Sequence, residues 1–394
     1  MNVLLGSDTY YPHVNGASYF TQRLAAGLQR RGHSVHVICP AQGRRAAITH
    51  HGDVVVHGIA SLPVPGYAAV RFSPWPFVYY QILGAVQRIV PDVMHIQNHF
   101  LIGRALSRIA PTLRIPLVAT NHFLPENFIV HVPFLSARHQ RTLDQWLWWD
   151  LCQAYNRAAI ITAPSVPAAQ ILTDHGIGGS VTAISCGIDL ARFYPHAAEP
   201  VIRDRYRLPT SPTYLYVGRL DREKHVDELI RALPLVRRRV DARLVIVGSG
   251  PLRMSLAELA KREDVEDQVI FTGFVADDDL PHVYAACDVF CQAGTAELQS
   301  IVTLEAMATG KPVIAANAMA LPALVHNGVN GYTFEPGDTC TLAARLIELL
   351  CDSTKREAMG QASLSIVTPH RIQHTIDAYE RLYALAVTGG GSPA

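Results

Sequence analysis

Two glutamates, Glu297 and Glu305, have seven residues between them in a segment that is otherwise small or apolar, GTAELQSIVTLEAMATGKPVIA (294–315). The segment joins two short β-branched runs, so its middle, from about Gln299 to Thr309, is predicted to be a helix. Glu297 is then expected in the loop before the helix, and Glu305 within the helix itself. Taken alone, Glu297 could equally be a helix-capping acid, and Glu305 could lie on a solvated helix face.

The expected start of this helix offers backbone amides that have no partner inside the helix, which suits a bound phosphate. These amides belong to Leu298, Gln299, Ser300 and Ile301. An acid on each side of a phosphate site predicts a ligand with hydroxyls at both ends. A nucleotide sugar fits this description, with its sugar toward Glu297 and its ribose toward Glu305.

Two cations precede this segment in the chain. Arg219 directly follows the apolar run TYLYVG, and Lys224 comes five residues later, where the next helical pattern begins. Charge-assisted hydrogen bonds to phosphate oxygens are roughly twice as strong as neutral ones. The pair therefore suits a diphosphate, although two ordinary surface cations would give the same pattern.

The elements that must position these residues follow one pattern along the whole chain. Short β-branched runs alternate with longer amphipathic stretches, which is typical of parallel βαβ units. In the first half the expected strands lie within 2–6, 33–39, 92–97, 116–122, 159–165 and 181–185. In the second half they lie within 213–219, 242–250, 268–273, 288–292 and 311–316.

The fold class predicted from this pattern is α/β, with two Rossmann-like doubly wound domains facing across a deep cleft. Residues 191–213 hold four prolines and no clean period, so the pattern breaks there. The expected parts are an N-terminal Rossmann-like domain (1–192), a linker (193–212), a C-terminal Rossmann-like domain (213–370), a C-terminal helix packing back toward the N-terminal domain (371–387) and a disordered tail (388–394). Ligands of such sheets bind at the carboxyl ends of the strands.

Composition limits the remaining choices. The N-terminus lacks a signal-peptide pattern and no apolar stretch approaches membrane-spanning length, so we expect a cytoplasmic protein, possibly peripheral on the inner face of the cell membrane. Seven cysteines without a CxxC pair suit buried thiols in a reducing compartment. The net charge of +1 divides unevenly: residues 1–195 have 14 arginines and 8 acids, a net of +6. That excess suggests an anionic surface or ligand for the first half, although drift in surface composition explains it as well.

Two rival kinds of site are disfavoured. A dinucleotide fingerprint is absent, because Gly248-Ser-Gly250 is not followed by the third glycine or by the acid that such sites need. A lone GxG after a strand is more often a tight turn. The acids Asp277, Asp278 and Asp279 precede a helical pattern and read as its cap and first turn, so no metal site is expected.

In its short motifs, the second half of the chain resembles the retaining family 4 glycosyltransferases of the GT-B fold. The resemblance is carried by GRLDREK, VGSGPLR, FTGFV, the E-x7-E pair, LEAMATGKPVIA and NGVNGYTFEPGD, and covers nearly the whole domain. The first half agrees more loosely, through SDTYYPHVNGAS, LQRRGHSVHVI, TNHFLPENF and SCGIDLARFYP. Within the family the motifs are closest to the diacylglycerol glucosyltransferase-like subgroup.

The resemblance implies roles for individual residues. Arg219 and Lys224 would hold the donor diphosphate, Glu305 the ribose, and Glu297 with the amides after it the transferred sugar. Gly16 would let backbone approach the phosphate, and the nucleobase would lie near Phe274 and Val275. His122 would contact the donor sugar, and the acceptor would lie near Asn15, Asn121, His122 and Glu126.

The reaction implied is transfer of a hexose from a UDP- or GDP-sugar to an alcohol acceptor with retention of configuration and without a metal or other cofactor. The acceptor is left open between a membrane lipid such as diacylglycerol and a small natural-product core. The stretch HQRTLDQWLWWDLCQAYNR (139–157) could lie on an anionic membrane, or it could be a core helix. No nucleic-acid partner is expected. Two alternatives are a UDP-GlcNAc 2-epimerase-type isomerase and a non-enzymatic nucleotide-sugar binding protein.

Overall fold

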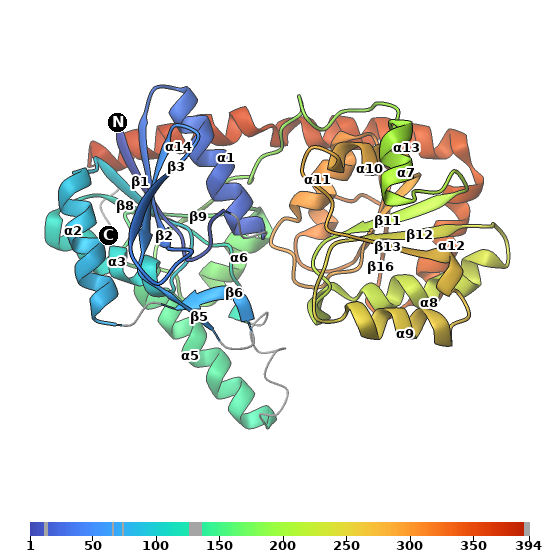
Figure 1. Ribbon diagram of the computed structural model, residues 1–394, viewed down its shortest axis with the longest axis horizontal. Coiled ribbons are helices and arrows are strands. Elements are labelled where there is room, and N and C mark those ends of the chain that lie inside the picture. Colours follow the sequence, from blue (N-terminus) through green and yellow to red (C-terminus); the bar gives the residue numbers. More distant parts are fainter. Residues whose placement is uncertain (12–14, 65–66, 73–74, 126–135, 390–394) are drawn as a thin grey trace. The chain divides into compact units, whose positions relative to one another are not determined.

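The computed structural model divides the chain into two compact units, each described by itself (Figure 1). Unit 1 comprises Met1–Gly187 and Ile372–Ala394, and unit 2 comprises Ile188–Arg371. The structure describes residues 1–11, 15–64, 67–72, 75–125 and 136–389. Every structural statement below refers to these residues.

The described part of unit 1 is built on an eight-stranded sheet with the order β10-β9-β8-β7-β1-β2-β4-β3. Neighbouring strands are parallel except for the edge strand β3, which is antiparallel to β4. The strands are β1 (Asn2–Gly6), β2 (Ser34–Pro40), β3 (Ala47–His51), β4 (Val54–Ile59), β7 (Val93–Ile96), β8 (Leu117–Thr120), β9 (Ile160–Ala163) and β10 (Val181–Ala183), with a separate hairpin of β5 (Leu62–Val64) and β6 (Tyr67–Phe72). The strand order reverses between β1 and β7, where ligands of such sheets bind.

Helices cover this sheet, and the last of them comes from the far end of the chain. They are α1 (Gly16–Arg30), α2 (Phe77–Ile89), α3 (Leu101–Leu113), α5 (Ala137–Tyr155), α6 (Val166–Asp174) and α14 (Ile372–Val387). α14 packs against α1 and against strands β7 and β8. Arg31 holds it from outside, with Nη1 2.5 Å from Asp377 and 2.6 Å from Glu380.

Unit 2 has an all-parallel, six-stranded sheet with the order β13-β12-β11-β14-β15-β16. Its strands are β11 (Thr213–Val217), β12 (Arg243–Val247), β13 (Val269–Gly273), β14 (Val289–Gln292), β15 (Val313–Ala316) and β16 (Gly331–Phe334). Its helices are α7 (Pro200–Tyr206), α8 (Val226–Arg237), α9 (Arg253–Arg262), α10 (Leu280–Ala286), α11 (Ile301–Ala308), α12 (Thr339–Cys351) and α13 (Ser353–Val367), with 3₁₀ turns η1 (Arg222–Lys224), η2 (Glu266–Gln268), η3 (Leu321–Ala323) and η4 (Thr368–His370). Here the order reverses between β11 and β14.

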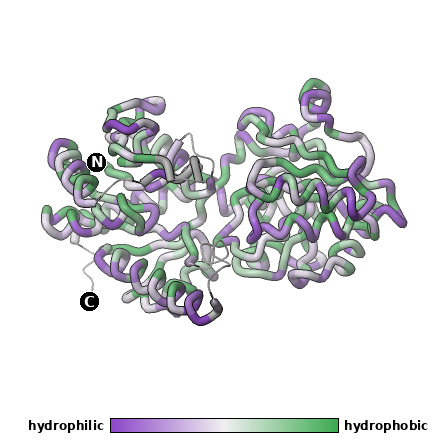
Figure 2. The backbone as a smooth tube through the Cα atoms, turned by 60° about the horizontal axis from the view of Figure 1, so that its bottom comes forward, coloured by the Kyte–Doolittle hydropathy of each residue, from purple (hydrophilic) through white to green (hydrophobic). Residues whose placement is uncertain are grey.

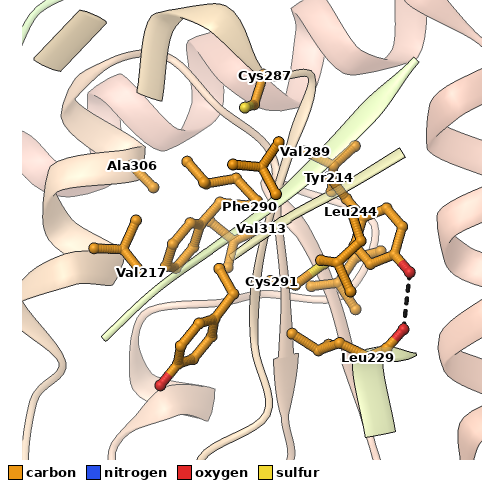
Figure 3. Close-up of a cluster of buried hydrophobic side chains, with 14 of the residues drawn as sticks. Tyr214, Val217, Leu229, Leu244, Cys287, Val289, Phe290, Cys291, Ala306 and Val313 are labelled. Atoms are coloured by element: carbon orange, nitrogen blue, oxygen red, sulfur yellow. Dashed lines mark hydrogen bonds between the residues drawn. The ribbon is translucent and has the colours of Figure 1, made fainter. Parts of the chain in front are cut away.

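Strands that are apolar along their whole length explain this architecture. A strand covered by helices on both faces reads as a continuous hydrophobic run, and Figure 2 shows hydrophobic residues concentrated in the inner segments of both units. In the core of unit 2, Tyr214, Phe290 and Val313 are fully buried (Figure 3). The Tyr214 hydroxyl donates to the carbonyl of Leu229 at 2.8 Å, so its one polar atom is paired.

The described strands include one for each β-branched run expected from the sequence, mostly with ends one or two residues inside the expected ranges. The strands β3, β4, β5, β6 and β16 were not expected. Residues 193–212, interpreted above as a linker, lie inside unit 2. Phe193, Ile202 and Leu208 are buried in the core of that unit, which explains why the segment is part of it.

Candidate functional site

The cationic and acidic residues singled out in the second half follow the two strands between which the sheet order of unit 2 reverses. Arg219 and Lys224 come after β11, and Glu297 comes after β14. Both strands are parallel neighbours, so their carboxyl ends meet at one edge. This is the position at which a doubly wound sheet binds its ligand.

Arg219 is held by two carboxylates of its own loop. Its Nη1 lies 2.5 Å from Asp221 Oδ2, and its Nη2 donates to Glu223 Oε1 at 2.9 Å. Both acids are nearly buried, whereas about half of the Arg219 side chain is exposed. The second carboxylate oxygen of Glu223, Oε2, is buried without a hydrogen-bond partner in the described structure. The arrangement fixes the guanidinium while leaving part of it open to an anion.

The loop that contains Gly248 and Gly250 packs closely against the Arg219 loop. A Cβ atom on Gly248 would lie 1.9 Å from the carbonyl oxygen of Gly218, and one on Gly250 would lie 2.5 Å from that of Leu220. Only glycine permits such close backbone approach. The loop after β12 therefore packs directly on the loop that carries Arg219, which gives both glycines a packing role.

Lys224 and Glu297 are brought together across the two loops. Lys224 Nζ donates to Glu297 Oε1 at 2.6 Å, and both side chains are mostly buried. The backbone of the Glu297 loop is also fixed, because Ala320 N–H donates to the Glu297 carbonyl at 3.1 Å and Thr295 N–H donates to the Glu223 carbonyl at 3.1 Å. The cation proposed for phosphate and the acid proposed for sugar are thus direct partners.

Helix α11 starts later than the sequence predicted and begins with a left-handed residue. It spans Ile301–Ala308, and its N-cap residue Ser300 has φ 67° and ψ 84°. A non-glycine residue in this region is uncommon and tends to occur at functional sites. The first intrahelical bonds are made by the amides of Thr303 and Leu304 to the Ser300 carbonyl. The amides of Ile301 and Val302 therefore precede the helical ladder, while Leu298 and Gln299 lie in the loop before it.

Glu305 is buried, with 4% of its surface exposed, so its interpretation as part of a solvated helix face is wrong. The Tyr284 hydroxyl of α10 donates to Glu305 Oε2 at 3.0 Å. A buried carboxylate with a fixed orientation is retained only where it has hydrogen-bond partners. The carboxylate of Glu305 is consequently held in one orientation and is not a mobile surface acid.

Phe274 and Val275, expected near a nucleobase, follow β13 at the same edge of the sheet. Phe274 is 60% exposed and Val275 is buried. An exposed aromatic ring directly after a strand offers a flat apolar surface. Their contact with a base stays a prediction.

In unit 1, His122 lies two residues beyond the end of β8 and close to Gln97, which follows β7. His122 Nε2 and Gln97 Oε1 are 3.1 Å apart, and the Phe20 ring lies 4.8 Å from the imidazole. Burial lowers the pKa of His122 to about 3. The imidazole is therefore neutral at physiological pH and can exchange hydrogen bonds, but it carries no charge.

The other residues expected in unit 1 have structural contacts. Asn15 caps α1, with its Oδ1 accepting from Ser18 N–H at 2.9 Å, and Gly16 is the first residue of that helix. Asn121 shapes the loop that carries His122, since its Nδ2 donates to the Phe123 carbonyl at 2.8 Å. The roles of these residues in acceptor binding stay predictions. Glu126 lies outside the described residues.

Four further residues were missed by reasoning from the sequence. Asp221 and Glu223 lie inside the quoted GRLDREK motif, but nothing in a short sequence shows that they hold its arginine. Tyr284 and Gln97 are distant in sequence from Glu305 and His122, so only the fold brings them together. The spacing of Asp221 and Glu223 from Arg219, two and four residues, is the one signal that the sequence contained.

Several other expectations concern groups outside this site. Within the described ranges, no group of three or more His, Cys, Asp or Glu side chains is arranged to hold a metal ion. Asp279 is the N-cap residue of α10, as expected, although it bonds to Arg205 and Tyr206 instead of the helix backbone. All seven cysteines are free thiols, but Cys340 and Cys351 are exposed, which corrects the expectation that all are buried. Among the helices described, none has the length and apolarity required to cross a bilayer.

Comparison with known families gives matches in both halves of the chain. The family described as "Glycosyltransferase Family 4" matches residues 14–192, and the one described as "Glycosyl transferases group 1" matches residues 199–365. A GDP-mannose-dependent alpha-mannosyltransferase from Mycobacterium tuberculosis is 31% identical over 323 residues, which cover 81% of this chain and 79% of that protein. An alpha-monoglucosyldiacylglycerol synthase from Streptococcus pneumoniae is 26% identical over 397 residues, covering 99% and 84%.

Solved structures agree in fold. Sucrose-phosphate synthase from Thermosynechococcus elongatus has a TM-score of 0.81 at 20% identity, with 98% of this chain and 99% of that chain covered. HepE from Anabaena, in complex with UDP and glucose, has a TM-score of 0.78 at 21% identity, with 98% and 99% covered. The fold is GT-B, with two Rossmann-like α/β domains. From the family matches and the level of identity to the mannosyltransferase, the chain belongs to glycosyltransferase family 4 and is a glycosyltransferase.

Proposed function

We propose that this protein transfers a hexose from a nucleoside-diphosphate sugar to an alcohol acceptor of a membrane lipid, with retention of configuration. The observation that carries the proposal is the meeting of Lys224 and Glu297, beside Arg219 and the start of α11, at the reversal point of the unit 2 sheet. Cations and open helix amides suit a diphosphate. An acid next to them suits sugar hydroxyls.

In this proposal each part of the site has one task. Arg219, Lys224 and the amides of Ile301 and Val302 bind the diphosphate. Glu297 accepts hydrogen bonds from hydroxyls of the transferred sugar, and the buried Glu305 accepts them from the ribose. Leu298, Gln299 and Ser300 border the sugar subsite, Phe274 and Val275 the base, and Gly16 the phosphate from unit 1. His122 contacts the donor sugar.

The chemistry asked of these residues is positioning and stabilisation of charge. When the bond between the sugar and the diphosphate breaks, negative charge develops on the leaving diphosphate, and fixed cations and amides stabilise it. The diphosphate takes the proton of the acceptor hydroxyl on the same face of the sugar. The enzyme gains rate mainly by holding the acceptor hydroxyl beside the leaving diphosphate on that face of the sugar. No side chain has to donate or accept a proton as a general acid or base, which is compatible with a neutral His122.

The choice of donor is proposed from the relatives. Two relatives with at least 30% identity over more than three quarters of this chain, the one from Mycobacterium tuberculosis named above and one from Mycolicibacterium smegmatis, are both GDP-mannose-dependent alpha-mannosyltransferases. GDP-mannose is therefore the first donor to test, followed by UDP-glucose. A glucosyl donor is favoured by the alpha-monoglucosyldiacylglycerol synthase, which matches more of the chain at lower identity.

The lipid acceptor is proposed from exposed aromatic and basic side chains on two helices of unit 1, α2 and α5. Helix α3 packs against both α2 and α5. On these helices Phe77, Tyr80, Trp146 and Trp149 are exposed by 70, 67, 51 and 56%. Arg138 and Arg141 are exposed on α5. Exposed tryptophan with arginine is typical of surfaces that lie on anionic membranes.

The test is a matrix of donors and acceptors. Purified protein is incubated with GDP-mannose or UDP-glucose and with diacylglycerol or phosphatidylinositol in mixed micelles, and products are analysed by mass spectrometry and by NMR of the anomeric proton. Formation of an α-glycosylated lipid supports the proposal. Conversion of UDP-GlcNAc without an acceptor identifies an epimerase instead, and intact donor in every mixture identifies a binding protein. Transfer to soluble alcohols alone retains the glycosyltransferase but overturns the lipid acceptor.

A further inference from the structure

A buried glutamine lies directly behind the histidine proposed for the sugar site. Gln97 follows strand β7, has no exposed surface, and its Oε1 lies 3.1 Å from His122 Nε2. Its backbone N–H donates to the Gly6 carbonyl at 2.9 Å. The side chain thus starts from a fixed point on the sheet, and its polar end reaches the imidazole.

The chemistry of the amide decides where the imidazole proton lies. An amide oxygen can only accept, so the hydrogen in this bond belongs to His122 Nε2. In a neutral imidazole the other nitrogen, Nδ1, is then an acceptor. Gln97 consequently selects one tautomer of His122, the one that can accept a hydrogen bond from a substrate hydroxyl at Nδ1.

Gln97 is retained at a cost in stability. Its Nε2 is buried and has no hydrogen-bond partner among the described residues. An unpaired buried donor has lost its hydrogen bonds to water without replacing them, so an apolar side chain of the same size would be no worse for folding. A residue that is unfavourable for stability and bonded to a proposed site residue points to a role in function.

The strand ends that carry Gln97 and His122 are joined by a buried network that includes helix α14. His95, two residues before Gln97, bonds through Nδ1 to the Tyr383 hydroxyl at 2.7 Å and through Nε2 to Thr120 Oγ1 at 2.6 Å. Tyr379 on the same helix lies 3.0 Å from Thr120 Oγ1. Thr120 is two residues before His122. The network therefore fixes the spacing of β7 and β8, and with it the Gln97–His122 bond.

We propose that Gln97 is the positioning residue of His122, holding the imidazole as the Nε2–H tautomer so that Nδ1 accepts a hydrogen bond from a hydroxyl of the donor sugar. The inference rests on the proposed function of His122. It assigns a role to a residue that has no expected contact with the substrate.

The first test compares Gln97→Met with His122→Ala and with the double variant. In Gln97→Met, loss of positioning lowers kcat/KM for the donor sugar by about 10- to 100-fold. The Kd for the nucleoside diphosphate alone stays unchanged. The midpoint of thermal unfolding stays unchanged or rises. In the His122→Ala background, Gln97→Met has no further effect, because both changes remove one interaction. Gln29→Met is the matched control. It also removes a glutamine oxygen that accepts a hydrogen bond, here from Val35 N–H at 3.2 Å, and it leaves kcat/KM unchanged.

The second test reads the tautomer and its pH dependence. The ring nitrogen shifts of His122, by NMR of ¹⁵N-histidine protein, report the Nε2–H form in the parent and a mixture in Gln97→Met. Gln97→Glu keeps the acceptor but adds a negative charge, which raises the pKa of His122. Activity of Gln97→Glu then falls as the pH decreases and His122 becomes protonated at Nδ1, whereas the parent shows no such ionisation.

The outcomes separate this inference from the function on which it rests. If His122→Ala transfers sugar normally, the proposed site in unit 1 is wrong and the inference fails with it. If His122→Ala is impaired but Gln97→Met is active, or if the two losses are additive, only the inference is overturned. A parent spectrum with the proton on Nδ1 overturns it as well.

Discussion

Lys224 and Glu297 form an ion pair, with Nζ 2.6 Å from Oε1, although 73 residues separate them in the chain. One is proposed to bind phosphate and the other sugar. In the structure each neutralises the other, so a bound diphosphate must share Lys224 with Glu297 or displace it. This pair links the two halves of the donor subsite.

The pair predicts opposite effects of two substitutions on nucleotide binding. Lys224→Met removes a phosphate cation and weakens the binding of GDP or UDP by about tenfold or more, as expected for loss of one charge-assisted hydrogen bond. Glu297→Gln leaves Lys224 without its counter-ion, so nucleotide binding stays equal or becomes tighter, while transfer falls by about 100-fold. Isothermal titration calorimetry and initial rates measure both. Equal losses of binding and transfer in Glu297→Gln would remove the acid from the sugar subsite.

Tyr284 is expected to set the orientation of Glu305 for the ribose. Tyr284→Phe preserves the packing of the ring but deletes the hydroxyl that lies 3.0 Å from Glu305 Oε2, so the KM for the donor rises severalfold. Tyr214→Phe is a matched control, because it deletes a hydroxyl in the same core that bonds only to the Leu229 backbone. Both variants lose similar stability. The prediction fails if the two variants have the same KM.

Stability of unit 1 is predicted to decrease in acid through its buried histidines. Burial lowers the pKa of His95 to about 3, below its unfolded value, so the unfolded state binds more protons as the pH falls from about 6.5. One such group costs about 2 kcal/mol at pH 5 relative to pH 8. Asp8, whose pKa is raised to about 6 by burial, acts in the opposite direction.

His95→Gln isolates the contribution of that histidine. The four tryptophans, at 75, 146, 148 and 149, all lie in unit 1, so fluorescence during urea unfolding reports on this unit. The variant loses less stability than the parent between pH 8 and pH 5. An equal loss of stability in both proteins would mean that His95 takes up its proton in the folded state as it does in the unfolded state, so that its pKa is not lowered.

The exposed tryptophans and arginines of α5 predict binding to anionic vesicles. At low salt the protein floats with phosphatidylglycerol vesicles and not with phosphatidylcholine vesicles, and Trp146→Ser with Trp149→Ser reduces the floated fraction severalfold. Met254→Ser, which replaces an apolar side chain of unit 2 that is 81% exposed, has no effect. Absence of the parent protein from the floated fraction would end the membrane proposal.

The positions of most strands could be predicted from the sequence because they depend on local patterns. Parallel strands buried on both faces are continuous apolar runs, and residues directly after them must lie at the carboxyl edge. Arg219, Lys224, Glu297 and His122 lie beyond strand ends, as this pattern predicts, while their roles in binding stay predictions. The edge strand β3, which is exposed along nearly its whole length, lacks such a pattern and was missed.

The partners of these residues could not be predicted, since they depend on packing between distant segments. The core-helix alternative for residues 139–157 would bury Trp146, yet Trp146 is exposed and Trp148 is buried, stacked on His175 at 3.8 Å. Likewise, the alternative of a solvated Glu305 is excluded only by the fold, in which α10 places Tyr284 beside it. The hydrogen bond between Gln97 and His122 and the network that includes α14 could not be predicted for the same reason, since they join segments that are distant in sequence.

The central claim is that one diphosphate binds between Arg219, Lys224 and the start of α11, with Glu297 and Glu305 on either side. A crystal structure with bound GDP or UDP tests it most directly. We expect phosphate oxygens within about 3 Å of the Arg219 guanidinium, of Lys224 Nζ and of the Ile301 amide, with the ribose hydroxyls on Glu305. A diphosphate bound elsewhere in the protein, with the Lys224–Glu297 pair and Arg219 untouched, would contradict it.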